Sequence, residues 1–325
     1  MPAELAETRR RDIYKIQGDN SKNKYCKVHF EISLYFCKVN FRIMIQKKTR
    51  TWLLAFATAL ISVAAPILFG GAVVLTSCTT EEYSVSRPTI ERIQQRGKLL
   101  VGTTGDYRPL TFCEPETGEY WGFGIEMAQA IADSIGVPVE FVRTSWPTLT
   151  ADVMAEPQTF DLAIGGITIT EARCAIMLMS EGYLANGKTI LCRTEDTSRF
   201  RSLEDIDRPD VRVMVNPGGL NEQFAHENLT HATIIVHPNN EEIPSLIAEG
   251  EADVMITEIT EAPYYVQTDP RLAAPLLNAP FTHGEIGALM RKGQDDLLNL
   301  VNGVIRRMKT DGSLQRLCEK YGLVP

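Results

Sequence analysis

The segment from Asp161 to Arg173 combines residue types that can bind an anion. An apolar run ends in Gly165 and Gly166, and Thr168 and Arg173 follow it. Glycine lets a ligand approach the backbone closely, while free N–H groups and a threonine hydroxyl can donate to an anion. The arginine adds a planar, permanently charged group that binds a carboxylate through two hydrogen bonds. The segment therefore predicts a carboxylate site, although a buried strand, a turn and a solvated arginine would fit the same residues.

Regular structure must position this segment, and strand and helix patterns alternate around it. Expected strands at 99–102, 139–142 and 160–164 alternate with expected helices at 125–135 and 149–154. The alternation restarts after residue 202, with strands at 211–215, 233–236 and 253–256 and helices at 220–229 and 243–248. This order predicts an α/β fold with largely parallel sheets covered by helices.

The restart indicates two similar α/β lobes. Asp161 and Asp253 each stand at the mouth of a buried strand, although this echo is too weak to prove duplication. Residues 183–191 and 287–291 look like strands that cross between the lobes, and helices at 295–309 and 313–321 return to the first lobe. Crossings of this kind predict a ligand cleft between the lobes.

The N-terminal region has the features of an export signal. The run from Trp52 to Leu75 has no charged side chain, and basic residues precede it. It ends in Leu-Thr-Ser-Cys at 75–78, which resembles a bacterial lipobox. We expect residues 44–77 to be a lipoprotein signal peptide, Cys78 to carry a lipid, and residues 78–95 to be a linker. The alternative is a retained transmembrane helix, because the run is long enough to span a bilayer.

Residues 1–43 show no sustained periodicity, and we expect them to be a gene-model extension before a start at Met44. Residues 1–77 hold twelve Lys/Arg and five Asp/Glu, so the formal charge changes from −8 for the whole chain to −15 for the remainder. So acidic a protein is a poor nucleic-acid binder, and local Arg and Lys must hold any anionic ligand. The irregular spacing of cysteines and histidines predicts no metal site. Four cysteines follow Cys78 and allow three disulfide pairings, which stay open: Cys113, Cys174, Cys192 and Cys318.

Several motifs resemble the periplasmic amino-acid-binding proteins of ABC transporters. They lie at 105–109, 122–126, 168–173 and 217–219, and the resemblance covers residues 90–325. It implies a periplasmic-binding-protein-like fold of type II, with lobe 1 at 96–190 and 284–325 and lobe 2 at 191–283. It also implies that Tyr107 and Trp146 flank the ligand, and that Thr168 and Arg173 hold its carboxylate. Gly166 is a further candidate contact with the ligand, because glycine lets a ligand approach the backbone. The position of Glu258 would bind its amine.

A further set of motifs is similar to the secreted cyclohexadienyl dehydratases. These motifs lie at 103–107, 144–147, 186–189, 215–219 and 236–238. Enzymes of this type share the binding-protein fold and convert prephenate to phenylpyruvate, or arogenate to phenylalanine. The reaction removes a ring carboxylate as CO2 and a hydroxyl as water, so the protein must orient the ring and supply a proton.

The dehydratase resemblance assigns that proton to Glu261 as the general acid. Burial and the like charge of Glu258 would raise its pKa, whereas a solvated glutamate in the first turn of a helix is the alternative. Lys188 would pair with the second carboxylate of the substrate or orient Glu261, unless it is a surface lysine. Trp146 would pack against the ring and Tyr107 would cover the opposite side.

The second lobe would contribute Asn216, Gly218 and Gly219, which also suit an ordinary turn. Three residues depart from the usual family pattern. Glu258 replaces an aspartate, Leu220 replaces a threonine that often bonds the ligand, and Gly124 replaces the aspartate of a Gly-Phe-Asp motif.

Two functions follow from these resemblances. The favoured one is a lipid-anchored dehydratase outside the cytoplasm, without a cofactor, acting on prephenate or arogenate. The alternative is an amino-acid-binding lipoprotein that delivers its ligand to an ABC permease. The two differ at Glu261 and Lys188, because a pure binding protein has no need for a buried acid beside a lysine. The preferred substrate and a homo-oligomeric state are left open.

Overall fold

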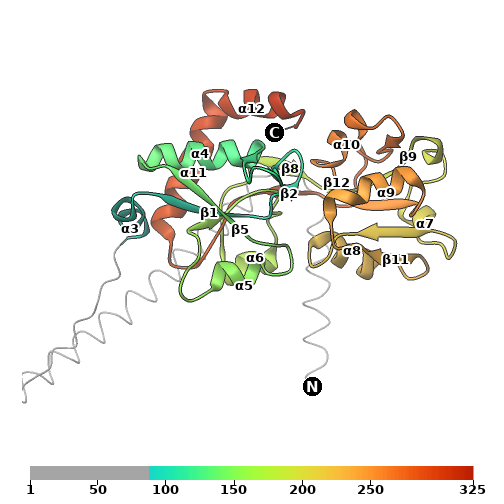
Figure 1. The fold of residues 1–325 in the computed structure, drawn as a ribbon, viewed down its shortest axis with the longest axis horizontal. Coiled ribbons are helices and arrows are strands. Elements are labelled where there is room, and N and C mark those ends of the chain that lie inside the picture. Colours follow the sequence, from blue (N-terminus) through green and yellow to red (C-terminus); the bar gives the residue numbers. More distant parts are fainter. Residues whose placement is uncertain (1–87, 325) are drawn as a thin grey trace, which may run out of the picture. The chain divides into compact units, whose positions relative to one another are not determined.

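This computed structural model describes residues 88–324. They contain two five-stranded sheets, each covered by helices (Figure 1). These residues belong to the unit Tyr83–Pro325. The expected extension at 1–43, the signal peptide at 44–77 and the lipidated Cys78 lie outside them. Within 88–324, no helix combines the length and apolar character needed to cross a bilayer.

The first sheet has the strand order β5-β1-β6-β15-β7, with β1 parallel to β5 and β6 and β15 antiparallel to its neighbours. Its strands are β1 (Leu99–Thr103), β5 (Val139–Arg143), β6 (Leu162–Ala163), β7 (Leu178–Met179) and β15 (Leu289–Met290). Its helices are α3 (Thr89–Arg96), α4 (Phe123–Ile135), α5 (Leu149–Met154), α6 (Glu171–Ile176), α11 (Asp295–Thr310) and α12 (Ser313–Tyr321). One sheet face packs against α4, α11 and α12, and the other packs against α5.

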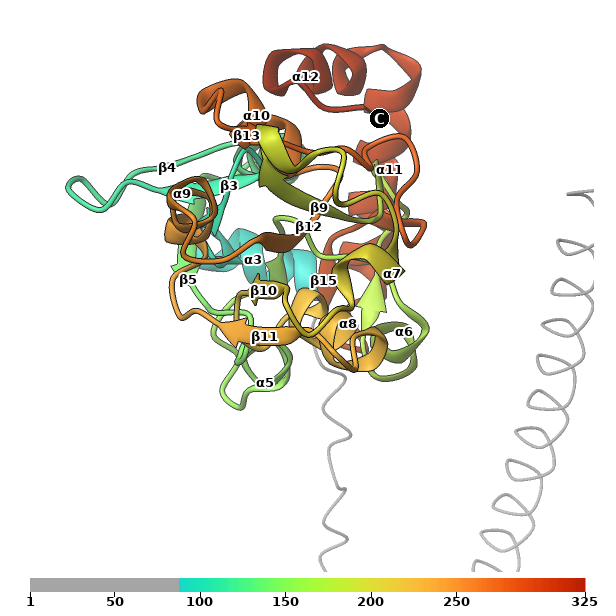
Figure 2. The ribbon, with the colours of Figure 1, turned by 90° about the vertical axis from the view of Figure 1, so that its right-hand side faces the viewer.

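The second sheet has the order β11-β10-β12-β9-β13. Its strands are β9 (Lys188–Arg193), β10 (Arg212–Val215), β11 (Thr233–Val236), β12 (Val254–Glu258) and β13 (Leu272–Ala273). Its α-helices are α7 (Leu203–Ile206), α8 (Leu220–Asn228), α9 (Ile243–Glu249) and α10 (Ala262–Thr268). Alternate strand residues face opposite sides, so Val213 and Val254 pack with α7 and α8, while Met214 and Met255 pack with α9 and α10 (Figure 2).

The segment expected to be a linker ends earlier than the sequence predicted. Thr89–Arg96 forms α3, and Ile93 on this helix is buried in the core of the first lobe. The backbone N–H of Ile90 donates to Asp296 Oδ2 of α11 at 2.9 Å, which fixes the start of the helix. The prediction of a linker up to residue 95 is therefore wrong for this helical part, because its apolar side chains pack onto the lobe.

The chain crosses between the lobes through β8 (Leu184–Asn186) and β14 (Gly284–Ile286), which pair in an antiparallel ladder. The first crossing lies within the expected segment 183–191. The second differs from the expected 287–291, because β15 in that segment pairs with β6 and β7 inside the first sheet. Lys188 follows the first crossing directly and is the first residue of β9.

The two aspartates of the sequence echo occupy equivalent places in the two lobes. Asp161 Oδ2 accepts the backbone N–H of Leu100 at 2.8 Å and pairs with Arg96. Asp253 Oδ2 accepts the backbone N–H of Arg212 at 2.9 Å, and the carboxylate also pairs with that guanidinium. Each aspartate therefore ties the strand that follows it to the strand beside it.

Two smaller features complete the described fold. A three-stranded sheet of β2 (Asp106–Tyr107), β3 (Thr111–Cys113) and β4 (Tyr120–Trp121) lies between β1 and α4 in the chain. Two 3-10 helices, η1 (Thr194–Asp196) and η2 (Asn240–Glu242), belong to the second half. All four cysteines within 88–324 are free thiols, so none of the three pairings left open is formed.

Candidate active site

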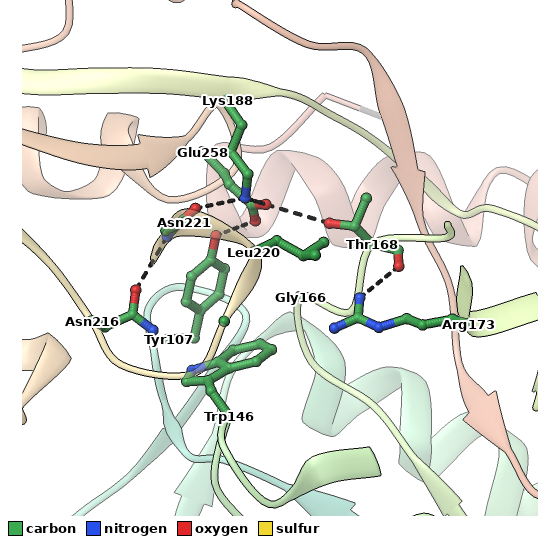
Figure 3. A pocket seen from close by; sticks show the side chains of 11 residues that line it. Tyr107, Trp146, Gly166, Thr168, Arg173, Lys188, Asn216, Leu220, Asn221 and Glu258 are labelled. Atoms are coloured by element: carbon green, nitrogen blue, oxygen red, sulfur yellow. Dashed lines mark hydrogen bonds and ion pairs between the residues drawn. The ribbon is translucent and has the colours of Figure 1, made fainter. Parts of the chain in front are cut away.

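A small cavity lies between the two lobes, at the carboxyl ends of their parallel strands. Parallel sheets place loops, and so ligand sites, at this edge. Figure 3 shows Lys188 and Glu258 entering from one side, with Tyr107 and Trp146 opposite them and Arg173 at a third side. The residues that line the cavity are Tyr107, Trp146, Gly166, Thr168, Arg173, Lys188, Asn216, Gly219, Leu220, Asn221 and Glu258.

Arg173 offers its guanidinium to this cavity from the short helix α6. Its backbone N–H donates to the side chain of Thr170, which caps the helix. One guanidinium nitrogen, Nη1, donates to the backbone carbonyl of Thr168 at 2.7 Å. Within residues 88–324, Arg173 forms no ion pair. Burial lowers its pKa, and the nearby Glu258 opposes that effect. A half-buried arginine without a carboxylate partner is suited to receive one from a ligand.

Gly166 lets the chain turn close to the aromatic side of the cavity. Its φ is +72°, and a Cβ there would meet the ring of Tyr107 at 2.7 Å, so a larger residue would be strained and would push on that ring. The Tyr107 ring contacts Trp146 edge-on, with 5.5 Å between centroids. The two rings therefore pack against each other, which differs from the expected arrangement on opposite sides of a ligand.

Lys188 and Glu258 form a buried ion pair on the cavity wall. They are directly opposed residues of the antiparallel strands β9 and β12, so the sheet register itself brings them together. Lys188 Nζ donates to Glu258 Oε1 at 2.6 Å and to Asn221 Oδ1 at 2.6 Å. The residues are only 6% and 4% exposed. The sequence predicted that Lys188 would orient Glu261 or bind the substrate, and in this structure its carboxylate partner is Glu258 instead.

Glu258 is held as a carboxylate by residues from both lobes. Tyr107 donates its hydroxyl to Oε2, and Thr168 donates its hydroxyl to Oε1 at 3.3 Å. Burial acts to raise the pKa of Glu258, but the Lys188 charge and the hydrogen bonds from Lys188 and Tyr107 outweigh it, so the pKa lies below its ordinary value. The cavity therefore contains an ionised acid that is already neutralised by a lysine.

Glu261 is in the opposite state and lies behind the cavity wall. It is fully buried at the start of α10 and is not among the lining residues. Asn240 Nδ2 donates to its Oε1 at 3.0 Å, and the Thr257 hydroxyl donates to its Oε2. Burial raises the pKa of Glu261 to about 8, and the charge of Glu258 adds to the effect. The predicted direction and causes of this shift are confirmed, whereas the expected position at the substrate is not seen.

The second lobe closes the cavity with the loop between β10 and α8. Gly219 lines the cavity, as expected, but Gly218 instead packs against the backbone of Pro147 in the first lobe. Asn216 also lines the cavity, and its Oδ1 accepts a hydrogen bond from Asn221 Nδ2 at 3.3 Å. Gly218 was expected to contact the substrate, but in this structure it contacts the other lobe instead.

Charged residues beside the cavity hold the lobes in this closed arrangement. Arg108 of the first lobe pairs with Glu241 of the second, and Asn240 Nδ2 donates to the carbonyl of Asp106 at 2.9 Å. Burial raises the pKa of Glu241 to about 7, although the Arg108 charge opposes it. Within residues 88–324, no group of His, Cys, Asp and Glu side chains is arranged to hold a metal ion.

Sequence reasoning missed two buried asparagines of this site. Asn221 joins Lys188 to Asn216, and its position five residues after Asn216 in an Asn-Pro-Gly-Gly-Leu-Asn run was the available signal. Asn186 accepts a hydrogen bond from Thr260 and donates one to Thr168, so it connects the crossing strand to both lobes. Asn186 stands two residues before Lys188, within the motif at 186–189 that resembles the cyclohexadienyl dehydratases.

Comparisons with known proteins identify the family of this chain. The family model of the bacterial extracellular solute-binding proteins, family 3, matches residues 99–324. The cyclohexadienyl dehydratase of Pseudomonas aeruginosa is 40% identical over 205 residues, which are 63% of this chain and 75% of that protein. The L-cystine-binding protein TcyJ of Escherichia coli is 27% identical over 233 residues, 71% of this chain and 85% of that protein.

A solved structure gives the same result at the level of the fold. The ancestral amino acid-binding protein AncCDT-1, described as a precursor of cyclohexadienyl dehydratase, matches with a TM-score of 0.65 and 38% identity. The match covers 72% of this chain and 99% of that chain. The predicted binding-protein fold, the resemblance to cyclohexadienyl dehydratases and the expectation of an exported protein are thereby confirmed. The chain belongs to family 3 of the bacterial extracellular solute-binding proteins.

Proposed function

We propose that this protein is a cyclohexadienyl dehydratase that converts prephenate to phenylpyruvate, or arogenate to phenylalanine. The observation that carries the proposal is the contrast between two neighbouring carboxyl groups. Glu258 is an ionised carboxylate beside Lys188, whereas Glu261 keeps its proton at neutral pH because its pKa is raised to about 8. Environments that separate two pKa values in this way supply an acid and an anion within one site. The 40% identity to a cyclohexadienyl dehydratase points to the same reaction.

In the proposed complex, Arg173 and Thr168 bind the side-chain carboxylate of the substrate. The guanidinium has donors to spare, because one nitrogen contacts the Thr168 carbonyl and no acid pairs with it within residues 88–324. The ring then lies against Trp146 and Tyr107, which form one aromatic wall. Asn216 and the backbone at Gly219 contact the substrate from the other lobe.

The chemistry needs one proton and no external oxidant. The bond from the ring to its carboxylate carbon breaks, CO2 leaves, and the electron pair enters the ring. The bond from C4 to the hydroxyl oxygen breaks at the far end of the ring, and that oxygen takes a proton and leaves as water. The side chain of Glu261 gives this proton and becomes a carboxylate, which solvent protonates again before the next turnover. Aromatisation of the ring drives the reaction forward.

For this step the Glu261 carboxyl must reach the substrate. Its present partners are Thr257, Asn240 and Tyr265, none of which lines the cavity. Catalytic hydrogen bonds are often long in ligand-free structures and shorten only in the complex. We therefore infer that substrate binding turns the Glu261 side chain toward the cavity, past Tyr107, whose own pKa is raised by burial and by the charges of Glu258 and Glu261.

The same fold also supports a second function, a binding protein for an amino-acid ABC transporter. The observation that favours it is the carboxylate site of Thr168 and Arg173, together with the 27% identity to an L-cystine-binding protein. Under either function we propose export through the signal at 44–77 and a lipid anchor on Cys78. Tight calorimetric binding of one amino acid, without turnover of prephenate, would favour the transport function.

Turnover by the purified full-length protein tests the dehydratase. Prephenate is supplied, and phenylpyruvate is followed by its absorbance in alkali. We expect turnover by the wild type, a fall in kcat/KM above about pH 8, and a loss of about 10²- to 10⁴-fold in kcat for Glu261→Gln, the usual contribution of a general acid. Glu140→Gln, at an exposed glutamate near the start of β5 that does not line the cavity, should behave as the wild type.

Absence of turnover by the wild type would refute the function. If Glu261→Gln were fully active and Glu258→Gln inactive, the dehydratase would stand but the assignment of the acid would be wrong.

A further inference from the structure

The carboxylate site and the Lys188–Glu258 ion pair stand side by side, which constrains the group next to a bound carboxylate. Thr168 belongs to the carboxylate site, and its hydroxyl also donates to Glu258 Oε1 at 3.3 Å. A ligand whose carboxylate is held by Arg173 and Thr168 therefore directs the substituent on its next carbon toward Glu258 and Lys188. In an amino acid that substituent is an ammonium group, and in a 2-oxo acid it is a carbonyl oxygen.

The acceptor capacity of Glu258 is largely used before any ligand arrives. Oε1 already accepts from Lys188 and Thr168, and Oε2 accepts from Tyr107. A carboxylate oxygen has about two acceptor positions, so little capacity is left for a ligand ammonium. The Lys188 ammonium thus already pairs with the carboxylate that a ligand amine would need.

Lys188, in contrast to Glu258, keeps one hydrogen-bond donor for a ligand. An ammonium group has three N–H donors and no acceptor, and two of its donors are directed at Glu258 Oε1 and Asn221 Oδ1. The third can donate to a carbonyl oxygen. A ligand ammonium has only donors and the same charge, so it would meet repulsion at this point in a buried, weakly screened site.

The net charge of the cavity wall also favours a ligand with a carbonyl oxygen over one with an ammonium group at this position. The charged residues that line the cavity within residues 88–324 are Arg173, Lys188 and Glu258, which leave one net positive charge. Prephenate has two carboxylates and no ammonium, and it is therefore a dianion. Arogenate has the same two carboxylates and an additional ammonium, so its charge suits this wall less well.

We propose that the Lys188–Glu258 ion pair makes the cavity selective for a 2-oxo acid over the corresponding 2-amino acid. Resting on the proposed function, this selectivity makes prephenate the preferred substrate over arogenate. The two reaction products differ only in the group that faces the ion pair, and neither reacts further here, so they report the selectivity without turnover.

The test is calorimetric binding of phenylpyruvate and of L-phenylalanine to the full-length wild type, near pH 7 and at about 0.15 M salt, where long-range surface charge is screened. We expect phenylpyruvate to bind at least about tenfold more tightly, which corresponds to about 1.4 kcal/mol. Equal affinities, or tighter binding of phenylalanine, would overturn the proposal without any variant. The ratio of kcat/KM for prephenate and arogenate should favour prephenate by a similar factor.

Variants of Lys188 then test whether this residue causes the preference for phenylpyruvate. Lys188→Met removes the ammonium and should reduce the preference to less than about threefold, while Lys188→Arg keeps the charge and should retain the preference. Lys98→Met removes a lysine of the surface pair Lys98–Glu140 and should leave both affinities unchanged. An unchanged preference in a folded Lys188→Met protein would contradict the assignment to Lys188. Because these are binding constants, a protein that turns over neither substrate would refute the proposed function and still decide the selectivity.

Discussion

Replacing Glu261 with glutamine should change how the stability of the protein depends on pH. In the folded state burial raises the pKa of this carboxyl to about 8, and the charges of Glu258 and Glu241 add to the shift, while hydrogen bonds from Thr257 and Asn240 oppose it. The ordinary value is 4.5. A group whose pKa is higher in the folded state stabilises that state while it is protonated. This contribution is complete below the ordinary pKa and is lost as the pH rises through about 8.

The magnitude follows from these two pKa values. Near pH 6 the unfolded chain has already released this proton, whereas the folded protein retains it. Between about pH 6 and about pH 9 the folded protein must release it too, at an expected cost of about 3 kcal/mol in the free energy of unfolding. Glutamine has the same shape, remains neutral and avoids this cost, so Glu261→Gln should become the more stable protein on the alkaline side.

Urea titrations of the wild type and of Glu261→Gln at both pH values measure the difference. Glu140→Gln serves as the matched control at an exposed glutamate and should keep the wild-type dependence. Equal losses of stability in the wild type and in Glu261→Gln, within about 0.5 kcal/mol, would mean that Glu261 is already ionised when folded. In that case it could not serve as the store of the catalytic proton, and the argument from the two carboxyl groups would fail.

Two further substitutions test the geometry of the cavity. Arg173→Lys keeps the charge but loses the planar pair of donors, so phenylpyruvate should bind about 10- to 100-fold more weakly by calorimetry. The unfolding temperature should stay close to wild type, because within residues 88–324 the guanidinium makes one hydrogen bond, to the Thr168 carbonyl, and the backbone bond to Thr170 is kept. Equal affinity would show that Arg173 does not hold the carboxylate. Gly166→Ala should lower the free energy of unfolding, measured by chemical denaturation, by about 1–3 kcal/mol and should displace Tyr107. Gly118 has a similar φ of +73° but open space around it, so Gly118→Ala should lower the free energy of unfolding only by the smaller backbone penalty. Equal costs at the two glycines would remove the contact with Tyr107 from the explanation.

Local patterns predicted most of the secondary structure. The helix at 149–154 and the strand at 233–236 have the expected bounds, since periodicity and flanking turn residues mark both ends. The expected strand at 160–164 is shorter, Leu162–Ala163. Beside this strand, the Asp161 carboxylate accepts the backbone N–H of Leu100, and the Phe160 ring packs onto Gly102 of the neighbouring strand. Contacts of this kind between distant segments leave no periodic signal.

The site was predictable in its composition but not in its pairings. Arg173 and Thr168 were found because a glycine turn, a hydroxyl and an arginine fall within nine residues. The partner of Lys188 depends on the register between strands β9 and β12, which lie 70 residues apart in the chain, and no local pattern encodes it. Likewise, a glutamate in the first turn of a helix can face solvent or the interior, so the burial of Glu261 became evident only from the fold.

The register that opposes Lys188 and Glu258 has a consequence for the sequence of events during binding. Both residues belong to the second lobe, whereas Tyr107 and Thr168, which also contact Glu258, belong to the first. If the lobes separate, Glu258 loses the two hydroxyl donors and keeps its lysine. Under the proposed selectivity, the Lys188–Glu258 pair that disfavours a ligand ammonium is therefore already present in an open protein, and an amino acid would be rejected at first encounter instead of after closure. Closure would then add hydrogen bonds around a ligand that has already been chosen.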